Sequence, residues 1–302
     1  MKKKILIVGG TGFIGTHLLT KLKKEKFDIT ILFSKNKKKI NKSVKKIICD
    51  ISNKKILSKK LKNKNFDYII NLAGYVDHKK KIKTLKTHFN GCKNLIDIFK
   101  KKKIIKFIQI GSSVEYGKIK APQTEDKKTD EKKLNSAYGL AKLRSTNYLI
   151  NLKKKFDFPF TVVRFFLVYG PGQLENRLVP HVIKNCLLNK KFKTSSGTQI
   201  RDFLYIDDAI NALFLILNNK KSNSHILNIC SNEPIKIKDV IELIVKKIKK
   251  GKPNYDEIKL RPDEPEQLYS SYSKAKKILQ WKPKIKINQG LSKTIKYYEQ
   301  YF

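Results

Sequence analysis

The 302-residue sequence is poor in several residue types and patterns, and each shortage excludes a class of protein. No apolar run approaches the roughly 20 residues that a membrane-spanning helix needs, so we expect no membrane partner. The first residues lead directly into a strand-like run, without the apolar core of a signal peptide. The four cysteines are far apart and lack CxxC spacing, which predicts reduced, packed thiols, a cytoplasmic protein and no metal site.

Arginine is also scarce, although the chain is strongly basic. Only five of the 68 basic residues are arginine, and the formal net charge is +43. Phosphate recognition in nucleic acids favours arginine, and the lysines are spread along the whole chain without an interleaved aromatic platform. We therefore interpret the charge as compositional drift and expect no nucleic-acid partner. The arginines that remain are Arg144, Arg164, Arg177, Arg201 and Arg261.

Glycine is limited to 14 residues, yet four of them fall between positions 9 and 15. They follow a continuous apolar run at 5–8, typical of a strand buried on both faces of a parallel sheet, and precede an apolar pattern with helical spacing. Gly9 is expected to form a tight turn, Gly12 to let phosphates approach, and Gly15 to let the helix pack on the strand. This strand, turn and helix predict a dinucleotide-binding site.

Strand-like and helix-like segments alternate along the first half of the chain, which predicts an α/β fold with a doubly wound parallel sheet. We expect a dinucleotide-binding domain at 1–166 and a smaller, mainly substrate-binding C-terminal lobe at 167–302, whose segments can interleave with the sheet. The expected strands are 5–8, 28–33, 46–49, 68–72, 105–110, 160–166 and 226–229. The expected helices are 53–61, 84–101, 136–152, 178–188, 206–217, 237–249, 273–279 and 289–301, besides the one that starts at Phe13.

Five motifs occur in a fixed order. They are Gly-Gly-Thr-Gly-Phe-Ile-Gly (9–15), Gly-Ser-Ser-Val-Glu-Tyr-Gly (111–117), Tyr-Gly-Leu-Ala-Lys (138–142), Val-Tyr-Gly-Pro-Gly-Gln (168–173) and Arg-Asp-Phe-Leu-Tyr-Ile-Asp-Asp (201–208). Together they resemble the extended short-chain dehydrogenase/reductase family, the Rossmann-fold epimerases, dehydratases and reductases of nucleotide sugars. The resemblance runs from Lys4 to about Tyr298 and implies an NAD(P)-dependent enzyme.

Tyr138 and Lys142 are the expected proton-transfer pair, with Ser112 as the third catalytic residue. Residues four apart on a helix share a face, so Lys142 can lie near the Tyr138 hydroxyl. A phenol has a pKa near 10, and a close cation favours the phenolate. The resemblance implies that Lys142 also holds the nicotinamide ribose and that Ser112 bonds the reacting oxygen. Its neighbour Ser113 is expected to contact substrate.

The resemblance implies further cofactor contacts. They are the glycine loop with Phe13 and Ile14, Asp50 and Ile51 at the adenine, Leu72, Ala73 and Gly74 under the cofactor, and Asn90 on the long helix behind the site. The second strand ends in Ser34 and Lys35 rather than in the acidic residue that favours NAD. We therefore expect NADP or NAD, with NADP slightly favoured.

The resemblance also assigns substrate contacts. Arg201 and Arg261 are expected to grip a substrate diphosphate, which suits a fork-shaped cation. Asn176 and Arg177 match a nucleotide-sugar contact. Leu167 departs from the family, which often has Asn at this position, and Arg164 precedes the site on its strand and is expected to be structural.

The last expectations concern the type of reaction and the oligomeric state. Ser112 is followed by Ser113 and Val114, without the Asp-Glu pair of dehydratases, so 4,6-dehydration is not expected. The motif at 111–117 is similar to that of 4-keto-6-deoxyhexose reductases, which favours net reduction at C4. The alternatives are a UDP-glucose 4-epimerase type of enzyme with tightly bound NAD and, more distantly, a non-catalytic dinucleotide-binding sensor. The resemblance also implies a homodimer through the helices at 84–101 and 136–152.

Overall fold

The computed structural model describes residues 2–34, 44–75, 80–134, 136–260 and 264–302. The predicted site residues Lys35 and Arg261 lie outside these ranges. The strands are β1 (Lys3–Val8), β2 (Phe27–Phe33), β3 (Lys45–Ile48), β4 (Tyr68–Asn71), β5 (Lys106–Ser112), β6 (Phe160–Phe165), β7 (Leu167–Tyr169), β8 (Lys191–Lys193), β9 (Ile200–Tyr205), β10 (His225–Ile229), β11 (Pro234–Lys236), β12 (Lys252–Asn254) and β13 (Gln267–Leu268).

The α-helices are α1 (Phe13–Leu22), α2 (Lys54–Leu61), α3 (Lys81–Leu85), α4 (Gly91–Phe99), α5 (Ala137–Phe156), α6 (Leu178–Leu187), α7 (Ile206–Asn218), α8 (Ile237–Ile248), α9 (Ser273–Leu279) and α10 (Ile287–Tyr298). A π-helical turn, η1 (Lys86–Asn90), joins α3 to α4. Short 3₁₀ turns are η2 (Ser113–Tyr116), η3 (Glu131–Lys133) and η4 (Lys220–Ser222).

Seven parallel strands form the main sheet, in the order β10-β6-β5-β4-β1-β2-β3. The predicted α/β fold with a large parallel sheet is therefore confirmed. The central strand β1 is buried on both faces: Ile5 and Ile7 face one apolar core, whereas Leu6 and Val8 face the other. Successive strand residues point to opposite faces, so a continuous apolar run is the pattern that such a strand requires.

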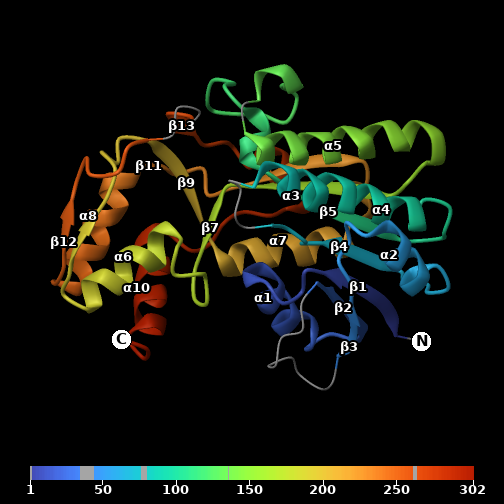
Figure 1. The fold of residues 1–302 in the computed structure, drawn as a ribbon, viewed down its shortest axis with the longest axis horizontal. Helices are drawn as coiled ribbons and strands as arrows, with labels where there is room; N and C mark the ends of the chain where they lie inside the picture. Colours follow the sequence, from blue (N-terminus) through green and yellow to red (C-terminus); the bar gives the residue numbers. More distant parts are fainter. Residues whose placement is uncertain (1, 35–43, 76–79, 135, 261–263) are drawn as a thin grey trace.

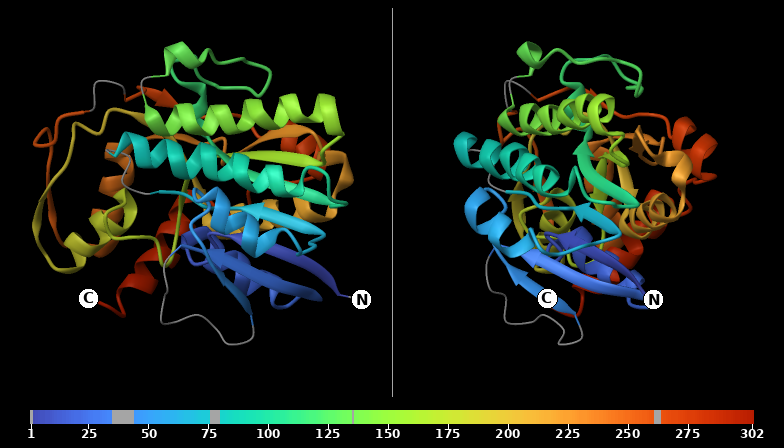
Figure 2. Two further views of the ribbon diagram at one scale, coloured as in Figure 1. Left: turned by 45° about the vertical axis from the view of Figure 1, so that its right-hand side comes forward. Right: turned by 90° about the vertical axis from the view of Figure 1, so that its right-hand side faces the viewer.

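Helices cover both faces of this sheet (Figure 1). α1 and α7 pack on the face that holds Ile5 and Ile7, while α2, α4 and α5 pack on the other. Both views in Figure 2 keep the two groups on opposite sides of the sheet. The carboxyl ends of the parallel strands consequently meet at one edge, where ligands of open α/β sheets bind.

The chain leaves the main sheet after β6 and later returns to it. β7, β9, β11 and β13 form a second, smaller sheet, and β8 pairs with β12. Between them, α7 leads to β10, which pairs in parallel with β6. α6, α8 and α10 pack together at the left of Figure 1, and their apolar side chains belong to the same core as α1 and α7.

The helix predicted at 84–101 is interrupted, which corrects the expectation of one regular helix. The backbone N–H of Gly91 donates to the carbonyl of Lys86, five residues back, so one turn is π-helical. Such single π turns are rare and occur frequently at functional sites.

Two further observations concern the described ranges only. None of their helices combines the length and apolar character that a membrane crossing requires. They also contain no group of three or more His, Cys, Asp or Glu side chains arranged to hold a metal ion.

Candidate active site

The glycine loop between β1 and α1 lies against the end of β4. Gly9 has a φ of 79°, a left-handed conformation that favours glycine, and its N–H donates to the carbonyl of Leu32 over 2.7 Å. A Cβ atom at Gly9 would lie 2.8 Å from the backbone nitrogen of Ala73 and 2.9 Å from the carbonyl carbon of Leu72. The structure thus brings together the loop and the strand end that the sequence assigned to the same cofactor.

Gly15 and Gly12 differ in what surrounds them. A Cβ atom at Gly15 would lie 2.7 Å from the backbone of Gly10, so close helix packing requires this glycine. Gly12 is exposed and caps α1, and among the described residues a Cβ there would meet only the Gly9 oxygen, at 3.4 Å. Packing therefore does not explain Gly12, whereas a diphosphate approaching the N-terminus of α1 would. The loop fits a dinucleotide.

Phe13 and Ile14 begin α1 and are partly buried against the main core. The Phe13 ring packs edge-on against His17, with 5.4 Å between ring centroids. Both side chains thus pack beside the loop.

The predicted adenine contacts lie beyond β3. The Asp50 carboxylate accepts hydrogen bonds from the N–H and the hydroxyl of Ser52, over 2.9 and 2.8 Å. Ile51 is buried, and the Asn94 side chain donates to its carbonyl over 3.0 Å. Ser34 is exposed directly after β2.

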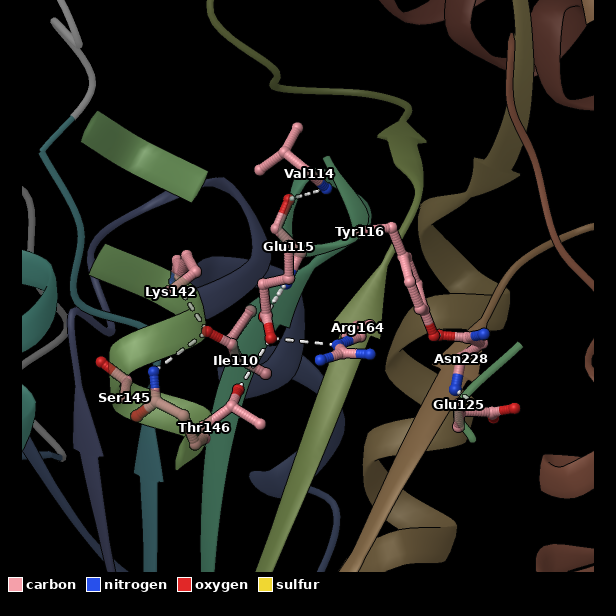
Figure 3. Close-up of polar contacts among 12 residues, drawn as sticks. Ile110, Val114, Glu115, Tyr116, Glu125, Lys142, Ser145, Thr146, Arg164 and Asn228 are labelled. Atoms are coloured by element: carbon pink, nitrogen blue, oxygen red, sulfur yellow. Dashed lines mark hydrogen bonds and ion pairs between the residues drawn. The ribbon is translucent and has the colours of Figure 1, made fainter. Parts of the chain in front are cut away.

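Lys142 is anchored to the sheet beside Tyr138. Its Nζ donates to the carbonyl of Ile110 on β5 over 2.6 Å (Figure 3). The same nitrogen lies 5.6 Å from the centre of the Tyr138 ring. Only 4% of Lys142 is exposed. Ser136 caps α5 by accepting a hydrogen bond from the Gly139 N–H, so Tyr138 lies in the first helical turn. The predicted pair therefore shares one end of α5.

Ser112 ends β5 and begins the η2 turn. Its Oγ accepts a hydrogen bond from the Val114 N–H over 3.4 Å, and its own N–H donates to Glu115 Oε1 over 2.8 Å. A Cβ at Gly139 would lie 3.0 Å from the Val114 oxygen, so the first turn of α5 packs closely on η2. This packing brings the Ser112 turn to the helix that carries Tyr138. Ser113 is buried.

His88 is a candidate site residue that the sequence did not reveal. It lies in the π turn η1, accepts a hydrogen bond at Nε2 from the Tyr75 N–H over 3.0 Å, and packs edge-on against the Tyr138 ring with 4.9 Å between centroids. Asn90, predicted behind the site, has an exposed side chain. The sequence feature that could have identified His88 is a histidine inside a helix of mostly lysine and apolar residues.

Arg201, the predicted diphosphate ligand, is engaged within the protein. Its Nη2 lies 2.5 Å from Glu264 Oε1, and its Nη1 donates to the carbonyls of Ile200 and Glu266. Asn176 and Arg177 are exposed at the start of α6.

Leu167, the departure from the family pattern, opens β7 opposite Phe203 of β9 and is exposed.

Arg164 and Glu115 form a buried ion pair behind this edge, with 3.0 Å between Arg164 Nε and Glu115 Oε2. Burial lowers the pKa of the Arg164 guanidinium, but the neighbouring Glu115 and Tyr116 raise it above its ordinary value overall. Burial raises the pKa of Tyr116 to about 12. Arg164 thus stays charged, and Tyr116 stays protonated.

Comparisons with known proteins agree with this geometry. A family model described as the NAD dependent epimerase/dehydratase family matches residues 5–230. The UDP-glucose 4-epimerase of Lactobacillus helveticus is 26% identical over 93% of this chain and 92% of its own length. The UDP-N-acetyl-alpha-D-glucosaminuronate decarboxylase of Bacillus cytotoxicus is 28% identical over 99% of both chains.

A solved structure is similarly close. The UDP-glucuronic acid 4-epimerase from Bacillus cereus, in complex with UDP-glucuronic acid and NAD, is 28% identical. The match covers 99% of this chain and 100% of that one, with a TM-score of 0.87. Relatives of equal similarity thus carry names of different reactions.

Proposed function

Because the chain belongs to the NAD dependent epimerase/dehydratase family, we propose that it transfers hydride and a proton at C4 of a nucleoside-diphosphate sugar. Its preferred reaction is the net reduction of a 4-keto-6-deoxyhexose. The observation that carries the proposal is the position of Lys142 beside Tyr138, together with the close packing of the first turn of α5 on the turn that Ser112 begins. Fold alone does not fix function, so the argument rests on these side chains.

Each of the three residues has a separate task. NAD(P), when bound, supplies or accepts the hydride. Tyr138 gives its phenolic proton to the C4 oxygen during reduction, or its phenolate takes the proton of the C4 hydroxyl during oxidation, and the Lys142 cation lies beside its ring. The bond from Lys142 to Ile110 holds this cation beside the Tyr138 ring. Ser112 orients the sugar oxygen through its hydroxyl group.

The residues after Ser112 argue against elimination of water. Ser113 and Val114 carry no carboxyl group, and Glu115, the one acid of the motif, is 0% exposed and paired with Arg164. An acid and a base that face the sugar are needed to remove water across C5 and C6. Oxidation and reduction at C4 need only the proton carrier Tyr138 and no second acid or base.

Substrate binding is proposed to use Asn176, Arg177, Arg201 and Arg261, with Ser113 beside the sugar. Arginine is suited to this task because its planar fork matches the phosphate oxygens. Cofactor binding is proposed to use the glycine loop, Asp50, Ile51, the end of β4 and Asn90.

A 4-epimerase is the second candidate, because the similar proteins from Lactobacillus helveticus and Bacillus cereus are named as 4-epimerases. Purified protein incubated with nucleotide sugars and their 4-keto derivatives separates the two. A reductase consumes one reduced cofactor per 4-keto sugar and purifies largely cofactor-free. Interconversion of two 4-epimers without net cofactor consumption would exclude the reductase.

The preference for NADP over NAD is supported by the exposed Ser34 directly after β2 and by a sequence that has no Asp or Glu between Asp28 and Asp50. Dissociation constants for NADPH and NADH test it, and clearly tighter NADH binding would refute it. NAD is bound in the Bacillus cereus structure.

We also propose a cytoplasmic homodimer without nucleic-acid or membrane partners. The four cysteines are buried and unpaired, as expected in a reducing compartment. Ile150 of α5 is exposed on one of the helices assigned to the dimer contact. Light scattering that shows only a 35 kDa particle at micromolar concentration would contradict the dimer.

A further inference from the structure

Glu115 uses both of its carboxylate oxygens on groups beside the catalytic residues (Figure 3). Oε1 accepts a hydrogen bond from the N–H of Ser112 over 2.8 Å. Oε2 accepts one from the Thr146 hydroxyl over 2.8 Å and pairs with Arg164. The carboxylate therefore joins three segments, the Ser112 turn, α5 and β6.

Gly111 on β5 leaves the space that this carboxylate occupies. A Cβ atom at Gly111 would lie 2.5 Å from Glu115 Oε1, which no real Cβ contact allows. Gly111 has no positive φ, so space rather than backbone conformation requires glycine there. The first glycine of the Gly-Ser-Ser motif is thus explained by Glu115.

A buried ion pair is a weak means of adding stability. Removing both charges from water costs several kcal/mol each, and apolar replacements are often equally stable. Glu115 and Arg164 are 0% and 3% exposed. The directed hydrogen bonds that a carboxylate can accept explain the pair better than added stability does.

Thr146 connects the Glu115 hydrogen bonds to the helix that carries Tyr138 and Lys142. Thr146 follows Lys142 by four residues, so both side chains lie on one face of α5. Lys142 bonds the carbonyl of Ile110, and Thr146 reaches Ser112 through Glu115. Two bridges therefore fix the end of β5 relative to the helix that carries Tyr138.

We propose that Glu115 is a positioning residue, whose carboxylate clamps the Ser112 turn to α5 and so sets the geometry of Ser112 relative to Tyr138. This inference rests on the proposed function of those two residues. Glu115 itself is buried and does not face the sugar.

Arg164 of β6 supports the Glu115 carboxylate through their ion pair. Its guanidinium lies 4.4 Å from the centre of the Tyr116 ring, and the Tyr116 hydroxyl donates to Asn228 Oδ1 on β10 over 2.8 Å. The carboxylate is thereby held against β6 and β10.

Thr146→Val tests the clamp, because it removes one hydrogen bond to Glu115 and keeps the shape and the ion pair. Thr146→Ser restores the hydroxyl. The matched control is Thr161→Val, which loses a buried hydrogen bond to the Ser222 carbonyl near the start of β6, away from the site. Turnover and the primary deuterium isotope effect with C4-deuterated reduced cofactor are measured for all three.

Thr146→Val is expected to lower kcat about tenfold and to raise the isotope effect, because a misplaced Ser112 slows hydride transfer itself. Thr146→Ser should recover both values, and Thr161→Val should keep both at the wild-type level despite a lower Tm. A purely structural role would reduce the active fraction and leave the isotope effect unchanged. An unchanged isotope effect in Thr146→Val therefore overturns the proposal.

Amide hydrogen exchange separates failure of the clamp from failure of the proposed function. Wild-type protein that turns over no nucleotide sugar refutes the function alone. In that case, exchange at the Ser112 amide should still be faster in Thr146→Val than in the wild type and in Thr161→Val. Equal exchange rates in all three proteins would refute the clamp.

Discussion

Arg201 and Glu264 form an ion pair in which Nη2 lies 2.5 Å from Oε1, and the Arg201 side chain is only 5% exposed. Glu264 is thus bound to the cation that we assign to the substrate diphosphate. Carboxylate and phosphate oxygens suit the same guanidinium fork. Substrate must therefore displace Glu264 or share Arg201 with it.

Glu264→Gln should lower the KM for the nucleotide sugar about two- to fivefold, since an ion pair whose carboxylate is 33% exposed contributes about 1 kcal/mol or less. kcat should change little. Initial rates at varied substrate give both values. Glu257→Gln, which removes the exposed partner of Lys193, is the control and should leave KM unchanged. A raised KM in Glu264→Gln would contradict this prediction and would indicate that Glu264 supports the conformation of its own loop.

Tyr138→Phe should abolish turnover while leaving cofactor binding nearly intact. The change removes the proton carrier and keeps the ring that packs edge-on against His88. A lost general acid or base reduces the rate by roughly 10²–10⁴-fold. Steady-state rates and cofactor titration by fluorescence measure the two effects. A variant that retains most of the wild-type rate would rule out Tyr138 as the proton carrier.

Lys142→Met should reduce kcat by a factor of roughly 100 or more and also weaken cofactor binding. It removes the cation beside Tyr138 and leaves the Ile110 carbonyl without this donor, which costs about 1–3 kcal/mol of unfolding free energy. Lys153→Met, an exposed position on the same helix, is the control for loss of charge. Equal kcat values in the two variants would contradict the assigned role.

Asp202 should make stability fall as pH rises through the weakly acidic range. Burial raises the pKa of its carboxyl to about 6, although the N–H groups of Ser231 and Asn232 donate to it. The unfolded value is about 3.9, so the folded protein holds the proton more tightly between about pH 4 and 6. The resulting stability is complete below pH 4 and is lost as pH rises through 6.

Urea unfolding of the wild type and Asp202→Asn at several pH values measures this contribution. The stability advantage of the wild type should shrink by about 2 kcal/mol between pH 4 and 7. The exposed Asp239→Asn serves as the control for a lost surface charge. An advantage that grows with pH would show that the hydrogen bonds outweigh burial.

Much of the fold was predictable because its signals are local. The strand, glycine turn and helix at the start, and the spacing of Tyr138 and Lys142, are each contained in a few consecutive residues. Glu115 and Arg164 are 49 residues apart and meet only through the β5–β6 pairing, which no local pattern records. His88 depends on a π turn that shifts the helical period.

The short strands of the second region were missed for a related reason. β7, β8, β11 and β12 have three residues each, too few for an alternating pattern to be distinguished from a loop. Their pairing comes from long-range contacts with neighbours such as β9.

The return of β10 to the main sheet makes the two regions inseparable. β10 covers the outer edge of β6, so a chain ended after residue 166 would expose a row of unpaired N–H and C=O groups along a strand that is buried throughout. It would also lose α7, which covers one face of the sheet. Such a fragment should self-associate rather than stay monomeric, and gene fusions that exchange only the first half should fail where whole-chain exchanges succeed.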